Sequence, residues 1–199
     1  MNLTMNHDVL TDRLGANEGA ALRIKQAVLV VLGIALLAVA AKIKIPMWPV
    51  PITMGTFAVL TIGAAYGPRL GLTTILSYMI LGAAGFDVFA GSTAEAYGLT
   101  YMMGGTGGYL VGYVLATLAL GMLARAGWDR SMPKMAVAML VGNALIYVPG
   151  LIWLGMLYGW DKPILEWGLT PFLVGDMIKL ALAALILPAV WKFVGDARR

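Results

Sequence analysis

The sequence predicts an all-α integral membrane protein with six transmembrane helices in one bundle. Of its 199 residues, 60% are hydrophobic and only 12% are charged, whereas about 25% of residues are charged in an average soluble domain. The mean hydropathy is +0.84. The apolar residues gather in stretches close to the roughly 20 residues that a membrane-spanning helix needs.

The predicted spans are residues 22–43, 53–66, 70–86, 107–124, 135–157 and 172–194. The second and third are short, and Gly67-Pro68-Arg69 lies between them. Pro68 interrupts a helix and Gly67 permits a bend, so we expect a turn there. One broken span is the alternative, and it would give five spans. We expect six, forming a domain at residues 21–199 after a polar cytoplasmic N-terminal tail at residues 1–20.

Lysine and arginine predict the orientation, because the cytoplasmic loops of membrane proteins carry an excess of both. With six spans and an inside N-terminus, ten basic residues lie on the cytoplasmic side and three lie outside. The sequence therefore predicts cytoplasmic termini and a multi-pass protein of the cytoplasmic (inner) cell membrane. The first 20 residues lack the basic start and apolar run of a secretory signal, so we expect no cleavage. The ten are Arg13, Arg23, Lys25, Arg69, Arg125, Arg130, Lys134, Lys192, Arg198 and Arg199, and the three are Lys42, Lys44 and Lys162.

The composition argues against several classes of function. The chain has no cysteine, and its single histidine, His7, lies in the polar tail. This removes disulfides, thiolate metal sites and cysteine or histidine catalysis. We therefore expect no metal, no cofactor, no catalytic residues and no enzyme activity. The net charge of +4 comes from basic residues beside apolar segments, which indicates a lipid bilayer as the partner and no nucleic acid.

Asp176 and Lys179 are the most informative residues, because they fall near the start of the last predicted span. A spacing of three residues places them on one face of a helix. A charge at membrane depth costs roughly 2.5–3.5 kcal/mol on insertion scales, so such residues usually face a cavity and carry function. The alternative is a structural ion pair between helices.

Three predicted helix starts, near Thr53, Gly107 and Phe172, lie on the outer side in this orientation. Helix N-termini present free N–H groups and a partial positive charge. If the three starts meet near Asp176 and Lys179, they form a polar, anion-tolerant pocket that is open to the outside.

The segments before these helices are unusual for loops. Residues 44–56 hold three prolines and Trp48, which suits either a stiff wall over a site or a plain connector at the membrane interface. Residues 104–108, ending in Gly107 and Gly108, form a glycine-rich run. Its glycines suit either backbone approach to an anion or close helix packing. The run is not a Walker P-loop, because no Gly-Lys-Ser/Thr follows.

Asn143 and Tyr147 lie four residues apart on one face of the fifth predicted span. They either line the same pocket or form hydrogen bonds between packed helices. Small residues in the first and fourth spans favour close helix approach, and Gly112 and Ala116 have the spacing typical of it.

Four segments together resemble the BioY family, the biotin-binding S components of energy-coupling-factor (ECF) vitamin transporters. They are PVPITMGTFAVLTIGAAYGPRLG at 49–71, GGTGGYLVGY at 104–113, GNALIYVPGLIWL at 142–154 and PFLVGDMIK at 171–179. The resemblance implies a six-helix bundle with both ends cytoplasmic and high-affinity biotin uptake from a site near the outer face. It also implies a membrane coupling (T) component and ABC-type ATPase subunits as partners, since this chain has no Walker motif of its own.

With biotin as the implied ligand, the chemistry of the residues suggests roles. Asp176 would accept from a ureido N–H, and Lys179 would donate to the ureido carbonyl or neutralise the valerate carboxylate. The backbone N–H groups at 106–109, including those of Gly107 and Gly108, are an alternative site for the carboxylate. Candidates for the apolar walls are Trp48, Phe89, Tyr109 and Tyr147.

The sequence departs from the family pattern at Gly55, where the family often has Gln, and at Asp87 and Gly105, where it often has Pro. These positions fall in loops expected to line the pocket. A stand-alone or ion-coupled vitamin carrier, with Asp176 as the titrating group, is the alternative function. The small-residue face of the first span is the predicted docking surface for the coupling component.

Overall fold

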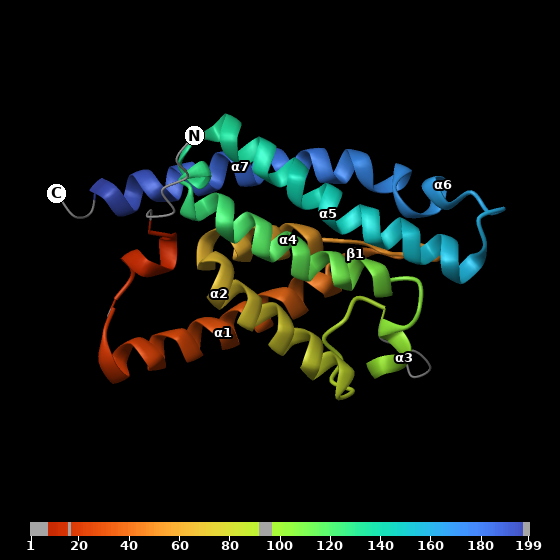
Figure 1. Ribbon diagram of the computed structural model, residues 1–199, viewed down its shortest axis with the longest axis horizontal. Helices are drawn as coiled ribbons and strands as arrows, with labels where there is room; N and C mark the ends of the chain where they lie inside the picture. Colours follow the sequence, from red (N-terminus) through yellow and green to blue (C-terminus); the bar gives the residue numbers. More distant parts are fainter. Residues whose placement is uncertain (1–7, 16, 92–96, 197–199) are drawn as a thin grey trace.

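The computed structural model describes residues 8–15, 17–91 and 97–196, and its long helices lie side by side (Figure 1). The elements in order are η1 (Leu10–Arg13), α1 (Gly19–Lys42), β1 (Lys44–Ile45), β2 (Ile52–Thr53), α2 (Gly55–Ala83), α3 (Gly98–Met102), α4 (Gly107–Arg125), η2 (Trp128–Arg130), α5 (Met132–Tyr158), α6 (Ile164–Gly168), η3 (Thr170–Phe172) and α7 (Leu173–Asp196).

The helical membrane architecture is confirmed. Four helical stretches among the described residues are long and apolar enough to cross a membrane: Gly19–Lys42, Gly107–Arg125, Met132–Tyr158 and Ile164–Val194. They contain the first, fourth, fifth and sixth predicted spans to within a residue at either end. The last stretch begins earlier than expected, because α6 and η3 precede α7.

The second and third predicted spans are the two halves of α2. Gly67 has φ 76° and ψ 178°, which breaks the helix, and Pro68 follows it. A Cβ atom on Gly71 would lie 3.6 Å from the Cα of Gly63. In a straight helix these two residues, eight positions apart, would be separated by about 12 Å. The two halves therefore fold back on each other, and the expected turn at Gly67-Pro68 is present. Each half alone is shorter than the roughly 20 residues of a full span.

The long helices pack against one another in chain order, and α7 also contacts α2. α2 packs against both α1 and α4, α4 packs against α5, and α5 packs against α7. The start of α1 and the end of α7 lie at the left end of Figure 1, and α3 and α6 lie at the right end. α4 and α7 both begin towards the right end and run to the left, as their predicted directions require.

Glycines allow the closest helix contacts. A Cβ atom on Gly112 would lie 2.6 Å from the Cα of Ile146 in α5, and one on Gly121 would lie 2.4 Å from the nitrogen of Pro68 in α2. Ala116, one turn after Gly112 on the same face of α4, is fully buried. Small residues in α4 thus bring it against α5 on one side and against the α2 kink on the other.

Two features were not predicted. β1 and β2 pair antiparallel, with Lys44 opposite Thr53, so the proline-rich loop is a small hairpin. Part of the expected N-terminal tail packs on the bundle: Val9 is fully buried, and Asp12 pairs with Arg125 at 2.6 Å. Residues 1–7 of that tail lie outside the described part of the chain.

We predict that Gly121→Ala lowers the free energy of unfolding by about 1–3 kcal/mol, because the added methyl group meets backbone atoms at the α2 kink. Thermal unfolding in a mild detergent measures this. The matched control is Gly175→Ala, where a Cβ atom has nothing within 4 Å and alanine favours the helix by about 0.5–1 kcal/mol. Equal stability of the two variants would contradict the proposed close contact.

Candidate ligand-binding site

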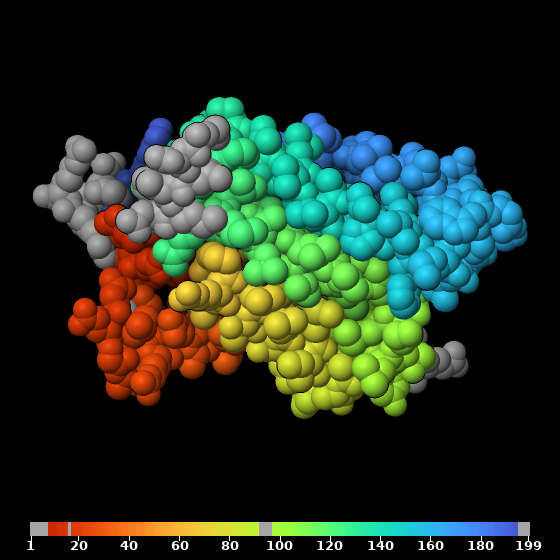
Figure 2. Space-filling view, viewed as in Figure 1, coloured from red at the N-terminus to blue at the C-terminus, as the bar shows by residue number. Residues whose placement is uncertain are grey.

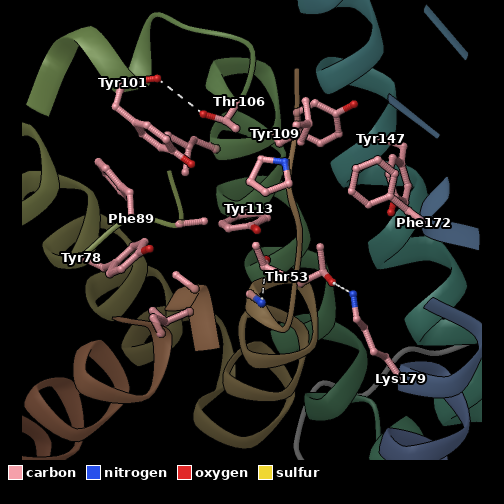
Figure 3. Close-up of a pocket in the computed structure, with 18 residues that line it drawn as sticks. Thr53, Tyr78, Phe89, Tyr101, Thr106, Tyr109, Tyr113, Tyr147, Phe172 and Lys179 are labelled. Atoms are coloured by element: carbon pink, nitrogen blue, oxygen red, sulfur yellow. Dashed lines mark hydrogen bonds between the residues drawn. The ribbon is translucent and has the colours of Figure 1, made fainter. Parts of the chain in front are cut away.

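A cavity lies where the first turns of α2, α4 and α7 meet (Figure 3). Its unfilled space is about 630 Å³, part of it open to the surroundings. The predicted convergence of three helix starts is therefore present, and the β1–β2 hairpin and α5 complete the walls. The lining residues are Leu37, Ala41, Val50, Pro51, Thr53, Gly55, Thr56, Tyr78, Phe89, Ala90, Tyr101, Thr106, Tyr109, Leu110, Tyr113, Tyr147, Phe172 and Lys179.

Four polar side chains form one hydrogen-bonded chain at the edge of this cavity. The Nζ of Lys179 donates to Oδ1 of Asp176 at 2.9 Å and to Oγ1 of Thr56 at 3.0 Å. The hydroxyl of Tyr147 donates to Oδ2 of Asp176. The chain links α5 to α7 and α7 to α2. Asp176 and Lys179 are only 5% and 7% exposed, so the pair is held largely away from water.

The pair is arranged so that Lys179 faces the cavity and Asp176 lies behind it. Lys179 lines the cavity, whereas Asp176 contacts it through its partners. An ammonium group has three donors, and Asp176 and Thr56 take two of them. The remaining donor is available to an acceptor in the cavity.

Aromatic rings cover two opposite sides of the cavity (Figure 3). On the α5 side, Tyr147 lies 6.0 Å from Tyr109 and 5.9 Å from Phe172 between ring centroids. On the other side, Phe89 stacks on Tyr101 at 4.9 Å. These faces suit a ligand with an apolar body, since aromatic walls give large contact area at low cost in side-chain entropy.

Two lysines hold the loop that carries Phe89 over the cavity. Lys42 donates to Asp87 at 2.6 Å and to the carbonyl oxygen of Phe89 at 2.8 Å, and Lys44 donates to the carbonyl oxygen of Ala90. Phe89 itself is 1% exposed. Nearby, burial raises the pKa of the Tyr101 phenol above its ordinary value, so this hydroxyl stays protonated at neutral pH.

Comparison with known proteins decides the family. The sequence model of the BioY family matches residues 11–196. The chain belongs to the BioY family. The probable biotin transporter BioY of Pyrococcus horikoshii is 37% identical over 165 residues, which are 83% of this chain and 95% of the relative. The biotin transporter BioY of Thermotoga maritima is 34% identical over 152 residues, 76% of this chain and 87% of the relative.

A solved structure shares the fold. The crystal structure of the S-component for biotin from an ECF-type ABC transporter matches with a TM-score of 0.74 at 22% identity, covering 88% of this chain and 95% of that one. This BioY-family chain therefore has an S-component fold. The family is one of membrane transporters and not of enzymes.

Five of the residues predicted to bind ligand line the cavity of this BioY-family protein, and Asp176 lies directly behind one of them. The five are Thr53, Phe89, Tyr109, Tyr147 and Lys179. The others, Asn143, Gly107, Gly108 and Trp48, do not line it.

The four residues outside the cavity have other surroundings. Asn143 is half-buried one turn before Tyr147. Cβ atoms on Gly107 and Gly108 would lie 2.3 Å from the carbonyl oxygens of Met102 and Pro149, so these glycines permit close packing. Trp48 is 66% exposed. It lies edge-on to two aromatic rings at centroid distances of 5.4 and 5.0 Å, those of Tyr158 and Trp167.

Several lining residues were not predicted. Tyr113 had a signal, because it follows Tyr109 by four residues and shares its face of α4. Thr56 is the hydrogen-bond partner of Lys179, 123 residues away in the sequence. Tyr78 and Tyr101 come from the second half of α2 and from α3. No local pattern places Thr56, Tyr78 and Tyr101 around the same cavity as Lys179.

The departures from the family pattern have identifiable surroundings. Gly55 lines the cavity, and a Cβ atom there would lie 3.0 Å from the hydroxyl of Tyr113. Asp87 is the ion-pair partner of Lys42. A Cβ atom on Gly105 would lie 3.1 Å from the carbonyl oxygen of Pro49. Glycine at 55 and 105 thus brings neighbouring groups close to the backbone.

We predict that Tyr147→Phe lowers the free energy of unfolding by about 1.5–3 kcal/mol, because one oxygen of the buried Asp176 carboxylate loses its donor. Thermal unfolding of the ligand-free protein measures this change. Tyr97→Phe is the control, since Tyr97 is 53% exposed. The same small loss in both variants would show that the Tyr147 hydroxyl does not stabilise the ion pair.

Proposed function

We propose that this chain takes up biotin across the cell membrane as the substrate-binding S component of an ECF-type transporter. The observation that carries the proposal is the buried Asp176–Lys179 pair at the edge of an aromatic cavity. The names of the relatives and of the structural neighbour supply the ligand class.

The polar groups of biotin match the pair. Its ureido ring carries two N–H donors and one strongly polar carbonyl. Asp176 retains acceptor capacity beyond its bonds to Tyr147 and Lys179, since a carboxylate has about four lone-pair sites. A shift of Asp176 towards the cavity would let it accept a ureido N–H. The third donor of Lys179 is available to either the ureido carbonyl or the valerate carboxylate.

The apolar groups of biotin match the walls. Tyr109, Tyr147 and Phe172 form one aromatic side for the thiophane ring and alkyl chain, and Phe89 forms the other. Thr53 and Tyr113 add hydroxyl groups between them. The proposed site thus combines six predicted residues with three that the structure adds. The predicted ones are Thr53, Phe89, Tyr109, Tyr147, Asp176 and Lys179, and the added ones are Thr56, Tyr113 and Phe172.

In the membrane we propose six crossings, with the halves of α2 counted separately and both termini cytoplasmic. The ten-to-three distribution of basic residues supports this orientation, as does the common end of the bundle at which α1 begins and α7 ends (Figure 1). The cavity then opens towards the outer face of the cytoplasmic membrane.

We predict that Asp176→Asn and Lys179→Ala each weaken biotin binding by about tenfold to a hundredfold. Each removes a charged hydrogen bond worth about 1.5–3 kcal/mol, and about 1.4 kcal/mol corresponds to tenfold in affinity. Binding of labelled biotin to the purified protein, with thiamine and riboflavin as competitors, measures the effect.

The matched control is Asp161→Asn. Asp161 also pairs with a nearby lysine, Lys162 at 2.8 Å, but its side chain is 72% exposed. This variant should bind biotin as the parent protein does. Unchanged affinity in both cavity variants would overturn the site, and competition by thiamine or riboflavin would overturn the ligand.

Energy for transport is proposed to come from a T component and ABC-type ATPase subunits. α1 is the proposed contact with the T component, because Val28, Leu32 and Val39 leave an apolar face exposed. Buried small residues Gly33, Ala40 and Ala41 lie on the opposite, inward face. Gly33, Ala40 and Ala41 of the predicted small-residue docking surface therefore pack inward, so the contact proposed here is the exposed apolar face instead.

We predict that reconstituted vesicles accumulate biotin only when this chain, a T component and ATP-hydrolysing subunits are all present. Uptake is measured with labelled biotin and ATP inside the vesicles, with an ATPase subunit lacking its Walker lysine as control. Uptake that follows a proton gradient without any ATPase subunit would support the ion-coupled carrier instead.

A further inference from the structure

A second cavity lies at the end of the bundle opposite the ligand site, between α1, the kink of α2 and η1. It contains about 1380 Å³ of unfilled space, part of it open to the surroundings. Figure 2 shows the surface hollowed where α1, in red, separates from α2, in yellow. Its lining shares no residue with the ligand cavity. The lining residues are Thr11, Asp12, Leu22, Lys25, Gln26, Leu29, Tyr66, Pro68, Arg69, Leu70, Thr73 and Arg125.

The walls of this groove combine an apolar surface with positive charge. Leu22, Leu29 and Leu70 supply the apolar part. Three basic side chains and one acidic side chain supply the charge, which is therefore positive overall. The charged residues are Lys25, Arg69, Arg125 and Asp12.

The three basic side chains differ in what they bind. Arg125 pairs with Asp12 at 2.6 Å. Lys25 donates to the carbonyl oxygens of Thr11 and Leu14, at 3.0 and 2.8 Å, and thereby holds η1 in place. Arg69 is exposed, and within the described ranges no side chain pairs with it. Arg69 is thus the charge that remains available to a ligand.

The position of the groove indicates the source of that ligand. Leu22 and Leu29 belong to the first turns of α1, a 24-residue apolar helix long enough to cross a membrane. Ile24 and Val28, between them in sequence, are 66% and 51% exposed and face outward from the bundle. The groove therefore adjoins the lipid phase at the level where a helix enters the membrane.

We propose that this groove binds an anionic phospholipid, with its phosphate at Arg69 and its acyl chain along Leu22, Leu29 and Leu70. Basic pockets between transmembrane helices near the membrane surface are suited to anionic headgroups, and the apolar wall suits the chain. A free anion would contact the charged side chains but would make no contact with the apolar wall. The site is distinct from the biotin cavity and does not depend on the proposed transport function.

The test is native mass spectrometry of the purified protein in neutral detergent, titrated with phosphatidylglycerol or phosphatidylcholine. The parent protein should bind phosphatidylglycerol more tightly than phosphatidylcholine, because the choline cation offsets the negative charge of the phosphate that the basic groove attracts. Arg69→Gln should weaken phosphatidylglycerol binding about tenfold, as expected for one charged hydrogen bond, and should narrow the difference in affinity between the two lipids. Leu29→Trp, which fills the groove, should weaken both lipids.

The matched control is Lys134→Gln, which removes an exposed basic residue at the start of α5 outside the groove and should leave lipid binding unchanged. Thermal unfolding confirms that each variant is folded. Equal binding of the two lipids, or equal effects of Arg69→Gln and Lys134→Gln, would overturn the proposal. Displacement of phosphatidylglycerol by millimolar inorganic phosphate would also overturn it, in favour of a soluble anion.

Discussion

The buried pair of Asp176 and Lys179 is the interaction on which the site depends. Removing two charges from water costs several kcal/mol per ion, and the cost is offset only when the geometry is good and the remaining donors and acceptors are satisfied. Tyr147 and Thr56 supply these additional hydrogen bonds. Since they come from α5 and α2, the pair also fixes how α7 lies against both helices. A ligand that offers one donor and one acceptor can join this network without leaving a charge unpaired.

The break in α2 allows one helical segment to contribute to two walls of the cavity. Its first half begins at the site with Gly55 and Thr56, and its second half returns to the site with Tyr78. The turn between them lies at the other end of the bundle, where Gly121 of α4 meets Pro68. Close contact at the turn therefore holds the two halves so that both reach the ligand site.

The two ends of the bundle carry different chemistry. At one end, hydroxyl groups, aromatic rings and a neutralised ion pair surround the proposed site for a small, mostly apolar ligand. At the other end, η1 is held by Lys25 and Arg125, and Arg69 remains open beside an apolar groove. Because no residue lines both cavities, contacts with the ligand and with lipid can be altered separately.

The sequence alone determined the helical membrane class and the turn at Gly67-Pro68, and it placed Asp176 and Lys179 together on one helix face, because hydropathy, proline and helical spacing act locally along the chain. It could not determine which groups meet Lys179, since Thr56 lies 123 residues away and only packing brings α2 and α7 together. It also could not decide whether Gly107 and Gly108 approach a ligand or a neighbouring helix. Glycine permits approach by a ligand or by a helix, and the tertiary structure shows that α5 occupies that space.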